Sequence, residues 1–237
     1  MRPKIYLFGD SITEESFSDG GWGAALANHF SRTADVVLRG YSGYNTRWAL
    51  KVKEKVFPPP ESGDAPLAVM VFFGANDASL PERCSGFQHV PLEEYKQNLV
   101  AIVAFLKKRW PSTRIILITP PPIDEDGRLL HPFFDDSSGL PERTNEAAGS
   151  YAKQCLAVAA ECGVSAIDLW RKMQQFPGWQ KGYLSDGLHL TANGNKVVFE
   201  EVIGRLREEQ ISLETLPADL PLIAEINPND PLKSFEN

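Results

Sequence analysis

The chain of 237 residues is poor in the features that mark secreted, membrane-spanning and disulfide-rich proteins. It has three cysteines, an odd number without Cys-x-x-Cys spacing, so we expect free buried thiols rather than a disulfide framework. No run of about 18 apolar residues occurs, so we expect no membrane-spanning helix. The first apolar run begins by Lys4, so we expect no signal peptide. Together these absences favour a cytoplasmic location.

Basic residues are also in the minority. Lysine and arginine number 24 against 31 aspartates and glutamates, and the net charge of −7 argues against a nucleic-acid partner. The Gly-x-Ser-x-Gly turn of α/β-hydrolases is absent, which argues against that class of hydrolase. Only four histidines occur, and none adjoins Asp10 or Asn76-Asp77. We therefore expect no metal, because two-metal sites need clustered His and Asp ligands. We also expect no cofactor.

Short β-rich runs alternate with helical patterns, which is typical of a parallel sheet covered by helices on both faces. We expect strands at Lys4–Phe8, Asp35–Arg39, Leu67–Phe73, Arg114–Thr119 and Val164–Asp168. We expect helices at Trp22–Thr33, Thr46–Phe57, Leu92–Trp110 and Glu142–Cys162, and a last one after Thr191 that runs to about Glu209. No repeat or break in composition divides residues 1–209, so the sequence predicts one α/β domain there, a three-layer α/β/α sandwich with a five-stranded parallel sheet.

Two segments do not fit this alternation. The connection from Pro120 to Pro141 is long, and loops of this length inside compact domains are usually functional or disordered. Because it follows the fourth expected strand, it should lie over the carboxyl edge of the sheet. Residues 210–237 form a tail punctuated by prolines. Its apolar side chains indicate that it packs on the domain or on a partner subunit, which leaves a homo-oligomer open.

Four short motifs fall where expected strands end or where the last helix begins. They are Gly9-Asp10-Ser11-Ile12, Gly40-Tyr41-Ser42-Gly43-Tyr44-Asn45, Gly74-Ala75-Asn76-Asp77 and Asp186-Gly187-Leu188-His189. The carboxyl ends of parallel strands share one edge, so the first three motifs should converge there. The fourth can join them if the last helix packs beside the first strand. Each motif alone is an ordinary turn sequence; the four in this order predict a site.

The residue types of these motifs suit nucleophilic catalysis. Ser11 could attack a carbonyl carbon while His189 takes its proton as general base. Asp186, three residues before the histidine, can reach the other imidazole nitrogen across one turn. The backbone N–H groups of Ser11 and Gly43 and the side-chain amide of Asn76 are candidate donors to an oxyanion.

The same residues carry a resemblance to the SGNH (GDSL-type) serine hydrolases, whose four blocks supply Ser, Gly, Asn and His. Ser11, Gly43, Asn76 and His189 occupy those blocks, and Asp186 occupies the position of the triad acid. The runs Phe8-Gly-Asp-Ser-Ile-Thr-Glu, Gly21-Trp22-Gly23 and Arg39-Gly-Tyr-Ser-Gly-Tyr-Asn-Thr46 further resemble the isoamyl-acetate-hydrolysing esterase branch. The resemblance implies a flavodoxin-like fold and a serine esterase that hydrolyses small carboxylic esters, short-chain acetates first, through an acyl-enzyme.

Several alternatives stay open at this stage. The same residues would serve an acyltransferase that passes the acyl group to an alcohol, and a metallophosphoesterase or a non-catalytic flavodoxin-like binding module would belong to other classes. Contacts with the small-molecule ester are expected from apolar side chains on loops near the site and from the aspartate beside the serine. The candidates are Asp10, Leu130, Phe133, Phe134, Phe176, Trp179 and Tyr183.

Overall fold

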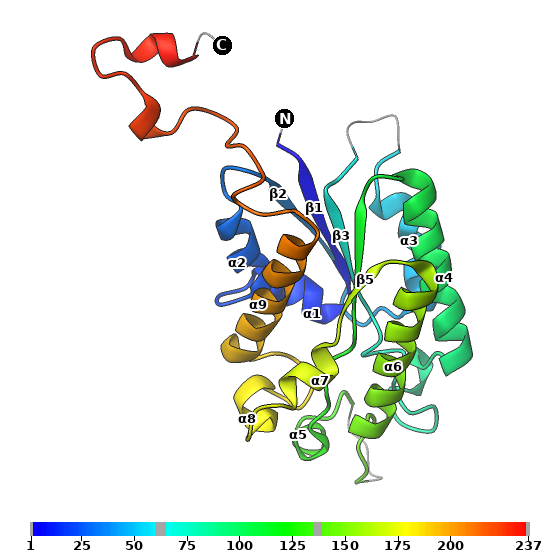
Figure 1. Ribbon diagram of the computed structural model, residues 1–237. Helices are drawn as coiled ribbons and strands as arrows, with labels where there is room; N and C mark the ends of the chain where they lie inside the picture. Colours follow the sequence, from blue (N-terminus) through cyan, green and yellow to red (C-terminus); the bar gives the residue numbers. More distant parts are fainter. Residues whose placement is uncertain (1, 60–64, 135–138, 236–237) are drawn as a thin grey trace.

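One parallel sheet organises the chain in the structure, a computed structural model that describes residues 2–59, 65–134 and 139–235. Within these residues five strands are hydrogen-bonded in the order β2-β1-β3-β4-β5 (Figure 1). They are β1 (Lys4–Gly9), β2 (Asp35–Gly40), β3 (Ala68–Phe72), β4 (Arg114–Ile118) and β5 (Ser165–Ile167). Gly9 pairs with Gly40 on one side and with Phe72 on the other. The carboxyl ends of β1, β2 and β3 therefore lie level with one another.

Helices cover both faces of the sheet (Figure 1). On one face lie α2 (Trp22–His29), α7 (Leu169–Met173) and α9 (Ala192–Glu208). On the other lie α3 (Thr46–Val56), α4 (Leu92–Arg109) and α6 (Asn145–Cys162). Along β1 the side chains alternate, with Ile5 and Leu7 in one core and Tyr6 and Phe8 in the other. A strand buried on both faces reads as the continuous apolar run seen in the sequence.

This arrangement confirms the predicted α/β/α sandwich and its five-stranded parallel sheet. The strands begin and end within a residue of their predicted bounds, but two helices do not. Helix α2 stops at His29, because Thr33 turns back and donates its backbone N–H to the Phe30 carbonyl at 2.9 Å. Helix α6 begins at Asn145 instead of Glu142, because the Thr144 side chain caps it by accepting from the Ala147 N–H at 3.2 Å.

Four short helices of the described residues at the carboxyl edge were not predicted. They are α1 (Ser11–Glu14), α5 (Glu125–Leu130), α7 and α8 (Trp179–Tyr183). Helices α1, α5 and α7 follow β1, β4 and β5, and α8 precedes the turn that carries His189. Each is too short for an apolar period to show in the sequence. Part of the predicted connection, residues 135–138, lies outside the described residues.

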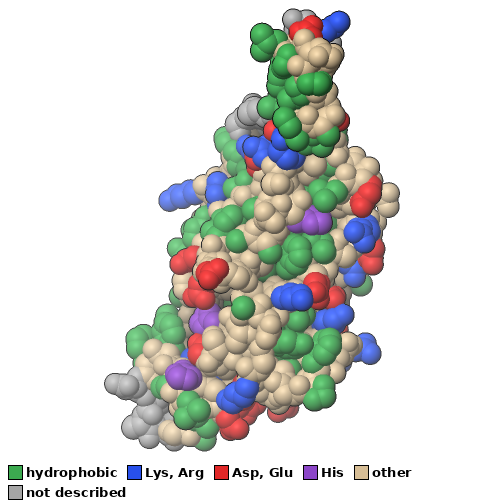
Figure 2. Space-filling view, turned by 90° about the vertical axis from the view of Figure 1, so that its left-hand side faces the viewer, with side chains coloured by type: hydrophobic (Ala, Val, Ile, Leu, Met, Phe, Trp, Pro, Cys, Tyr) green, Lys and Arg blue, Asp and Glu red, His purple; other side chains and the backbone are tan. Residues whose placement is uncertain are grey.

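The tail after α9 begins on the domain and then leaves it (Figure 1). Ile211 and Ser212 are buried, and Asp219 forms ion pairs with Arg2 and Arg32. Farther along, Ile223 is 86% exposed. Figure 2 looks onto the side of α2 and α9 and shows the tail standing off the body with hydrophobic side chains on its surface. No helix in the described part of the chain has the length and apolar character to cross a membrane.

Candidate active site

Ser11 opens α1 directly after β1, at the carboxyl edge of the sheet. Asp10 caps this helix, because its Oδ1 accepts from the Ile12 N–H at 3.1 Å. A short polar side chain at the N-cap is what lets a helix start immediately after a strand. The Ser11 side chain is therefore held at a fixed point on the edge, with the residue 6% exposed.

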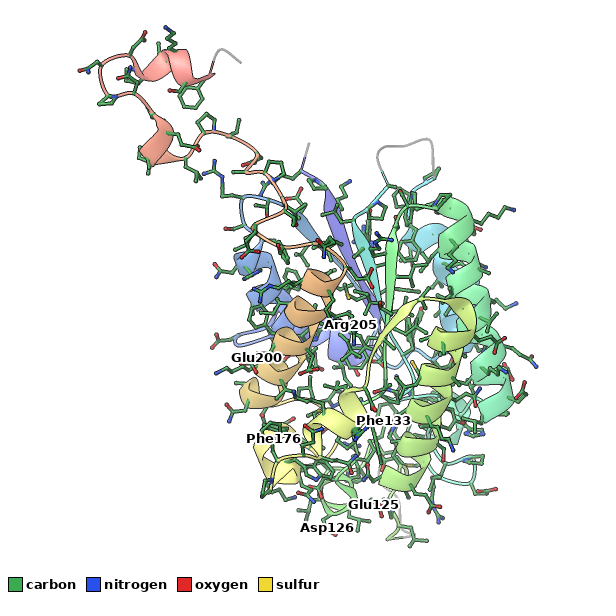
Figure 3. The ribbon with its side chains drawn as sticks, in the orientation of Figure 1. Glu125, Asp126, Phe133, Phe176, Glu200 and Arg205 are labelled. Carbon is green, nitrogen blue, oxygen red and sulfur yellow. The ribbon has the colours of Figure 1, made fainter. Side chains whose placement is uncertain are left out.

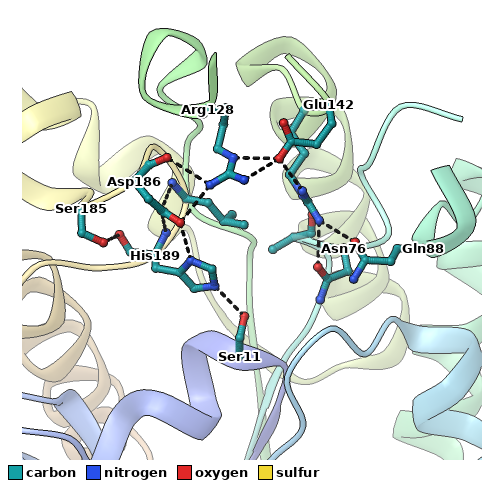
Figure 4. A network of polar contacts seen from close by, with 11 residues as sticks. Ser11, Asn76, Gln88, Arg128, Glu142, Ser185, Asp186 and His189 are labelled. Atoms are coloured by element: carbon teal, nitrogen blue, oxygen red, sulfur yellow. Dashed lines mark hydrogen bonds and ion pairs between the residues drawn. The ribbon is translucent and has the colours of Figure 1, made fainter. Parts of the chain in front are cut away.

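The turn between α8 and α9 brings a histidine to this serine (Figure 4). Nε2 of His189 lies 2.9 Å from Oγ of Ser11, and Nδ1 of His189 lies 2.8 Å from Oδ2 of Asp186. The other carboxylate oxygen, Oδ1, accepts the backbone N–H groups of Leu188 at 2.9 Å and His189 at 2.7 Å. Gly187 allows this turn with φ at +90°, and a Cβ there would come within 2.4 Å of the Asp124 carbonyl.

Burial and pairing shift the protonation of both groups. Burial alone would raise the pKa of Asp186, but the hydrogen bond and charge of His189 hold that pKa far below its usual range. Burial alone would lower the pKa of His189, but the hydrogen bond and charge of Asp186 raise it above the ordinary 6.5. The imidazole is therefore a stronger base than a free histidine, and its Nδ1 proton is directed at the carboxylate.

The two other predicted motifs lie across the site from the histidine. Asn76 follows β3, and its Nδ2 donates to the Tyr44 carbonyl at 2.8 Å. Gly43 follows β2 with φ at +78°, a backbone conformation that favours glycine, and its carbonyl accepts from Nε2 of Gln88 at 3.0 Å. An amide nitrogen carries two hydrogens, so Asn76 keeps one for a ligand after bonding Tyr44.

Three buried charged residues border the site, and sequence reasoning missed them (Figure 4). Nη1 of Arg128 donates to Oδ2 of Asp186 at 2.9 Å, and the same guanidinium pairs with Glu142 at 2.6 Å. Glu142 also pairs with Arg143 at 3.0 Å. Nη2 of Arg143 in turn donates to Oδ1 of Asn76 at 3.0 Å. The side chains of Arg128, Glu142 and Arg143 are only 2–3% exposed. Charged residues are almost always on the surface, so nothing in the amino-acid sequence around these three residues indicates that they are buried.

Aromatic rings line one side of the loops around the site. We call the set Tyr44, Trp48, Phe87, Phe133 and Phe134 the aromatic row. Tyr44, whose carbonyl accepts from Asn76, meets Trp48 edge to face at 5.7 Å, and Trp48 stacks on Phe87 at 6.3 Å. Phe87 in turn meets Phe133 at 6.3 Å and Phe134 at 6.4 Å. Phe87, Phe133 and Phe134 are 46–56% exposed, so the outer end of the row is open to a ligand.

The other apolar residues predicted to contact the substrate lie outside the aromatic row. Leu130 is 72% exposed at the end of α5, and Trp179 packs partly buried against the core on the α9 face. Phe176 meets Tyr183 edge to face at 5.8 Å. Figure 3 shows Phe133 and Phe176 at the same end of the molecule as Glu125 and Asp126 of α5.

Asp10 differs from the prediction in a specific way. It is only 1% exposed, so its carboxyl group caps α1 instead of lining the surface of the site. Its Oδ2 has no hydrogen-bond partner within the described residues, and burial raises its pKa to about 7. Nowhere in residues 2–59, 65–134 and 139–235 do three His, Cys, Asp or Glu side chains gather as metal ligands would.

The chain is similar to known proteins in sequence and in fold. A family described as GDSL-like lipase/acylhydrolase matches residues 5–202. A GDSL esterase/lipase of Arabidopsis thaliana is 70% identical over 100% of this chain and 99% of its own length. A Bos taurus protein named isoamyl acetate-hydrolyzing esterase 1 homolog is 45% identical over 95% of this chain and 90% of its own. Among solved structures, a lipase/acylhydrolase from Enterococcus faecalis superposes with a TM-score of 0.68 at 26% identity, covering 93% of this chain and 100% of that one.

Proposed function

This chain belongs to the GDSL-like lipase/acylhydrolase family and is a carboxylic ester hydrolase, and we propose that it cleaves small esters with Ser11, His189 and Asp186 as its catalytic triad. The observation that carries the proposal is the hydrogen-bonded series from the serine to the aspartate. Oγ of Ser11 and Nε2 of His189 are 2.9 Å apart, which is proton-transfer distance. The paired Asp186 keeps the imidazole in the tautomer that can accept this proton.

The proposed reaction runs in two balanced halves. Oγ of Ser11 forms a bond to the ester carbonyl carbon while its proton passes to Nε2 of His189, and the carbonyl oxygen becomes an oxyanion. When the tetrahedral intermediate collapses, the bond to the alcohol oxygen breaks, and His189 returns the proton to that oxygen. A water molecule then attacks the acyl-enzyme by the same steps, which releases the carboxylic acid and restores Ser11.

We assign stabilisation of the oxyanion to the N–H groups of Ser11 and Gly43 and the amide of Asn76. All three follow strands that end level at the carboxyl edge. The amide hydrogen of Asn76 that does not bond Tyr44 is the side-chain donor of the set. Donors fixed before the reaction stabilise the developing charge most, because they need not reorganise as it forms.

The substrate we propose is an ester of a short acyl group, acetate first. The bovine relative, which is 45% identical, is named as a homologue of an esterase that hydrolyses isoamyl acetate. The aromatic row begins beside Asn76 and offers an apolar surface to the carbon chain of such an ester. Leu130 at the end of α5 and Trp179 are further candidates for contacts of this kind.

Labelling with a fluorophosphonate tests the nucleophile. The probe should attach to Ser11 of the wild-type protein and fail to attach to Ser11→Ala, and hydrolysis of p-nitrophenyl acetate should fall about 10⁴-fold or more in that variant. Ser18→Ala, an exposed serine after α1, is the matched control and should keep full activity. Near-normal activity of Ser11→Ala, or a label on another residue, would show that the mechanism is wrong.

A panel of p-nitrophenyl esters of increasing acyl length tests the substrate proposal. Wild-type kcat/KM should be highest for acetate, and replacing Phe133 and Phe134 together by Ala should change the preference for chain length. Phe235→Ala removes a similarly exposed ring on the tail, 53% exposed, and should leave the preference as it is. An unchanged preference in the double variant would remove the outer aromatic row from the binding site.

The three cysteines bear on where the enzyme works. Cys84, Cys155 and Cys162 are all free, and Cys155 is buried. Free thiols are typical of reducing compartments, which supports our proposal that the protein is cytoplasmic. Cell fractionation with a tagged full-length protein would test this; recovery in a secreted or organelle fraction would contradict it.

A further inference from the structure

A continuous series of polar contacts, built mostly from buried charged side chains, joins the two halves of the site (Figure 4). It runs from Asp186 through Arg128, Glu142 and Arg143 to Asn76. We propose that Arg128, Glu142 and Arg143 are positioning residues, which fix the aspartate that orients the base and the amide that receives the oxyanion. The inference rests on the proposed function, because it assigns these residues a role in the same reaction.

At one end of the series Arg128 shares a carboxylate oxygen with the histidine. Oδ2 of Asp186 lies 2.9 Å from Nη1 of Arg128 and 2.8 Å from Nδ1 of His189. Nη1 of Arg128 also donates to the Asp186 carbonyl at 3.1 Å. The guanidinium thus helps to fix the position of the carboxylate oxygen that contacts the imidazole. Its positive charge also offsets part of the carboxylate's pull on the Nδ1 proton, which keeps the imidazole from becoming too strong a base.

At the other end Arg143 determines which way an amide points. An asparagine amide has an oxygen that accepts and a nitrogen that donates, and the two differ little in size. Arginine only donates, so Nη2 of Arg143 selects Oδ1 of Asn76, at 3.0 Å, and leaves Nδ2 on the other side, toward the Tyr44 carbonyl. The same Nη2 donates to Oε1 of Gln88 at 2.8 Å, which turns Nε2 of Gln88 toward the Gly43 carbonyl. One guanidinium therefore orients two parts of the proposed oxyanion hole.

The charges of the series balance. Arg128 and Arg143 contribute two positive charges, and Glu142 and Asp186 contribute two negative ones. Burial of ions costs stability unless each is paired, and apolar side chains of similar size stabilise a core at least as well. A set of four charges, three of them buried and that of Asp186 partly exposed, is thus weak support for the fold by itself. The contacts of Arg128 with Asp186 and of Arg143 with Asn76 give these buried charges a role in the proposed reaction.

A double-mutant cycle tests the Arg143 end. Arg143→Met should lower kcat on p-nitrophenyl acetate about 10- to 100-fold with KM changed less than about threefold, because the oxyanion exists only in the transition state. In the Asn76→Ala background, which itself should lose about 10²–10³ in kcat, the same change should cost less than about threefold. An equal loss in both backgrounds would overturn the role of Arg143. Arg143→Lys restores charge and one donor, and should recover part of kcat.

The protonation of His189, measured by NMR, tests the role of Arg128. The charged groups that face this imidazole are Asp186, Asp10 and Glu15, together with Arg128 on the shared carboxylate oxygen. Arg128→Gln removes the positive charge, while the two backbone N–H groups still hold Oδ1 of Asp186. We therefore expect the NMR titration of His189 to move to higher pH. The loss in kcat/KM should be about threefold larger at pH 6 than at pH 8. A titration that stays in place or moves to lower pH would overturn this part.

Arg109→Met is the matched control for both ends. Arg109 is largely buried, pairs with Glu54, and bonds the carbonyls of Phe57 and Pro58 at the amino edge of the sheet. Its loss should leave kcat and the His189 titration unchanged, even if the melting temperature falls. The NMR titration needs no substrate, so it tests Arg128 even if Ser11→Ala were to keep esterase activity. Failure of the proposed function and failure of this inference are thereby told apart.

Discussion

At the scale of single residues, the proton affinity of His189 decides when the site can work. Only the neutral imidazole can accept the Ser11 proton, and Asp186 raises its pKa above 6.5. A raised pKa means that the imidazole is still protonated at pH values where a free histidine has lost its proton. As pH is lowered, the activity should therefore begin to fall at a higher pH than it would if the base were a histidine with the ordinary pKa of 6.5.

Glu15 gives this expectation a specific test. It is exposed, and its charge contributes to the raised pKa of His189. Glu15→Gln should move the acid limb of kcat/KM to lower pH, more clearly at low salt, because salt screens exposed charges. Glu200→Gln on α9, also exposed, should leave the limb where it is. An acid limb that moves up in Glu15→Gln, or stays at the same pH at low salt, would contradict the assignment of His189 as base.

At the scale of elements, the positions of the site residues that follow strands could be predicted from the sequence. Ser11, Gly43 and Asn76 follow apolar runs whose parallel pairing brings their ends together, and that pairing needs only the alternation of strand and helix. The contacts of Arg128 and Arg143 could not be predicted in this way. Arg128 lies on a helix of six residues, and Arg143 precedes the cap of α6, where the sequence pattern suggested helix. Which charged side chains turn inward depends on loop paths that no periodicity specifies.

The N-cap of α1 carries a prediction about stability. Burial raises the pKa of Asp10 from 3.8 to about 7, so between these values the folded protein keeps a proton that the unfolded chain releases. Stability then falls as pH rises through this window, since the folded state binds more protons. Asp10→Asn keeps the cap oxygen and has no charge to bury. Relative to wild type, its melting temperature should therefore be higher at pH 8 than at pH 5.

The comparison between the two pH values isolates the buried carboxyl group. Any cost of the new amide nitrogen is the same at both and cancels. Burial raises the pKa of Asp77 to about 7 as well, so the fall in stability should be reduced in Asp10→Asn and not abolished. Asp126→Asn replaces an exposed carboxylate on α5 and serves as control, with equal changes at pH 5 and pH 8. The same result for Asp10→Asn would mean that Asp10 is ionised in the folded protein.

At the scale of the whole molecule, the tail divides at the point where its contacts end. Residues 211–219 are joined to the domain, since Ile211 is 5% exposed, Leu216 packs against the core, and Asp219 pairs with Arg2 and Arg32. Arg32 also donates to the Leu220 carbonyl at 2.9 Å. Beyond this point Ile223 is 86% exposed and Leu232 is 77% exposed. The prediction that the tail packs on the domain or on a partner subunit thus concerns two different parts.

Two truncations separate these parts. Deleting residues 211–237 removes buried apolar surface that contributes on the order of 2–3 kcal/mol to the free energy of unfolding. The deletion should therefore lower the melting temperature by about 5–10 °C. Deleting residues 222–237 should change it by less than about 2 °C and leave kcat/KM unchanged, because exposed side chains contribute little to stability. A larger loss from the shorter deletion would mean that the outer tail packs in solution. Light scattering would then show whether a second copy of the chain provides that contact, as a dimer that dissociates when residues 222–237 are removed.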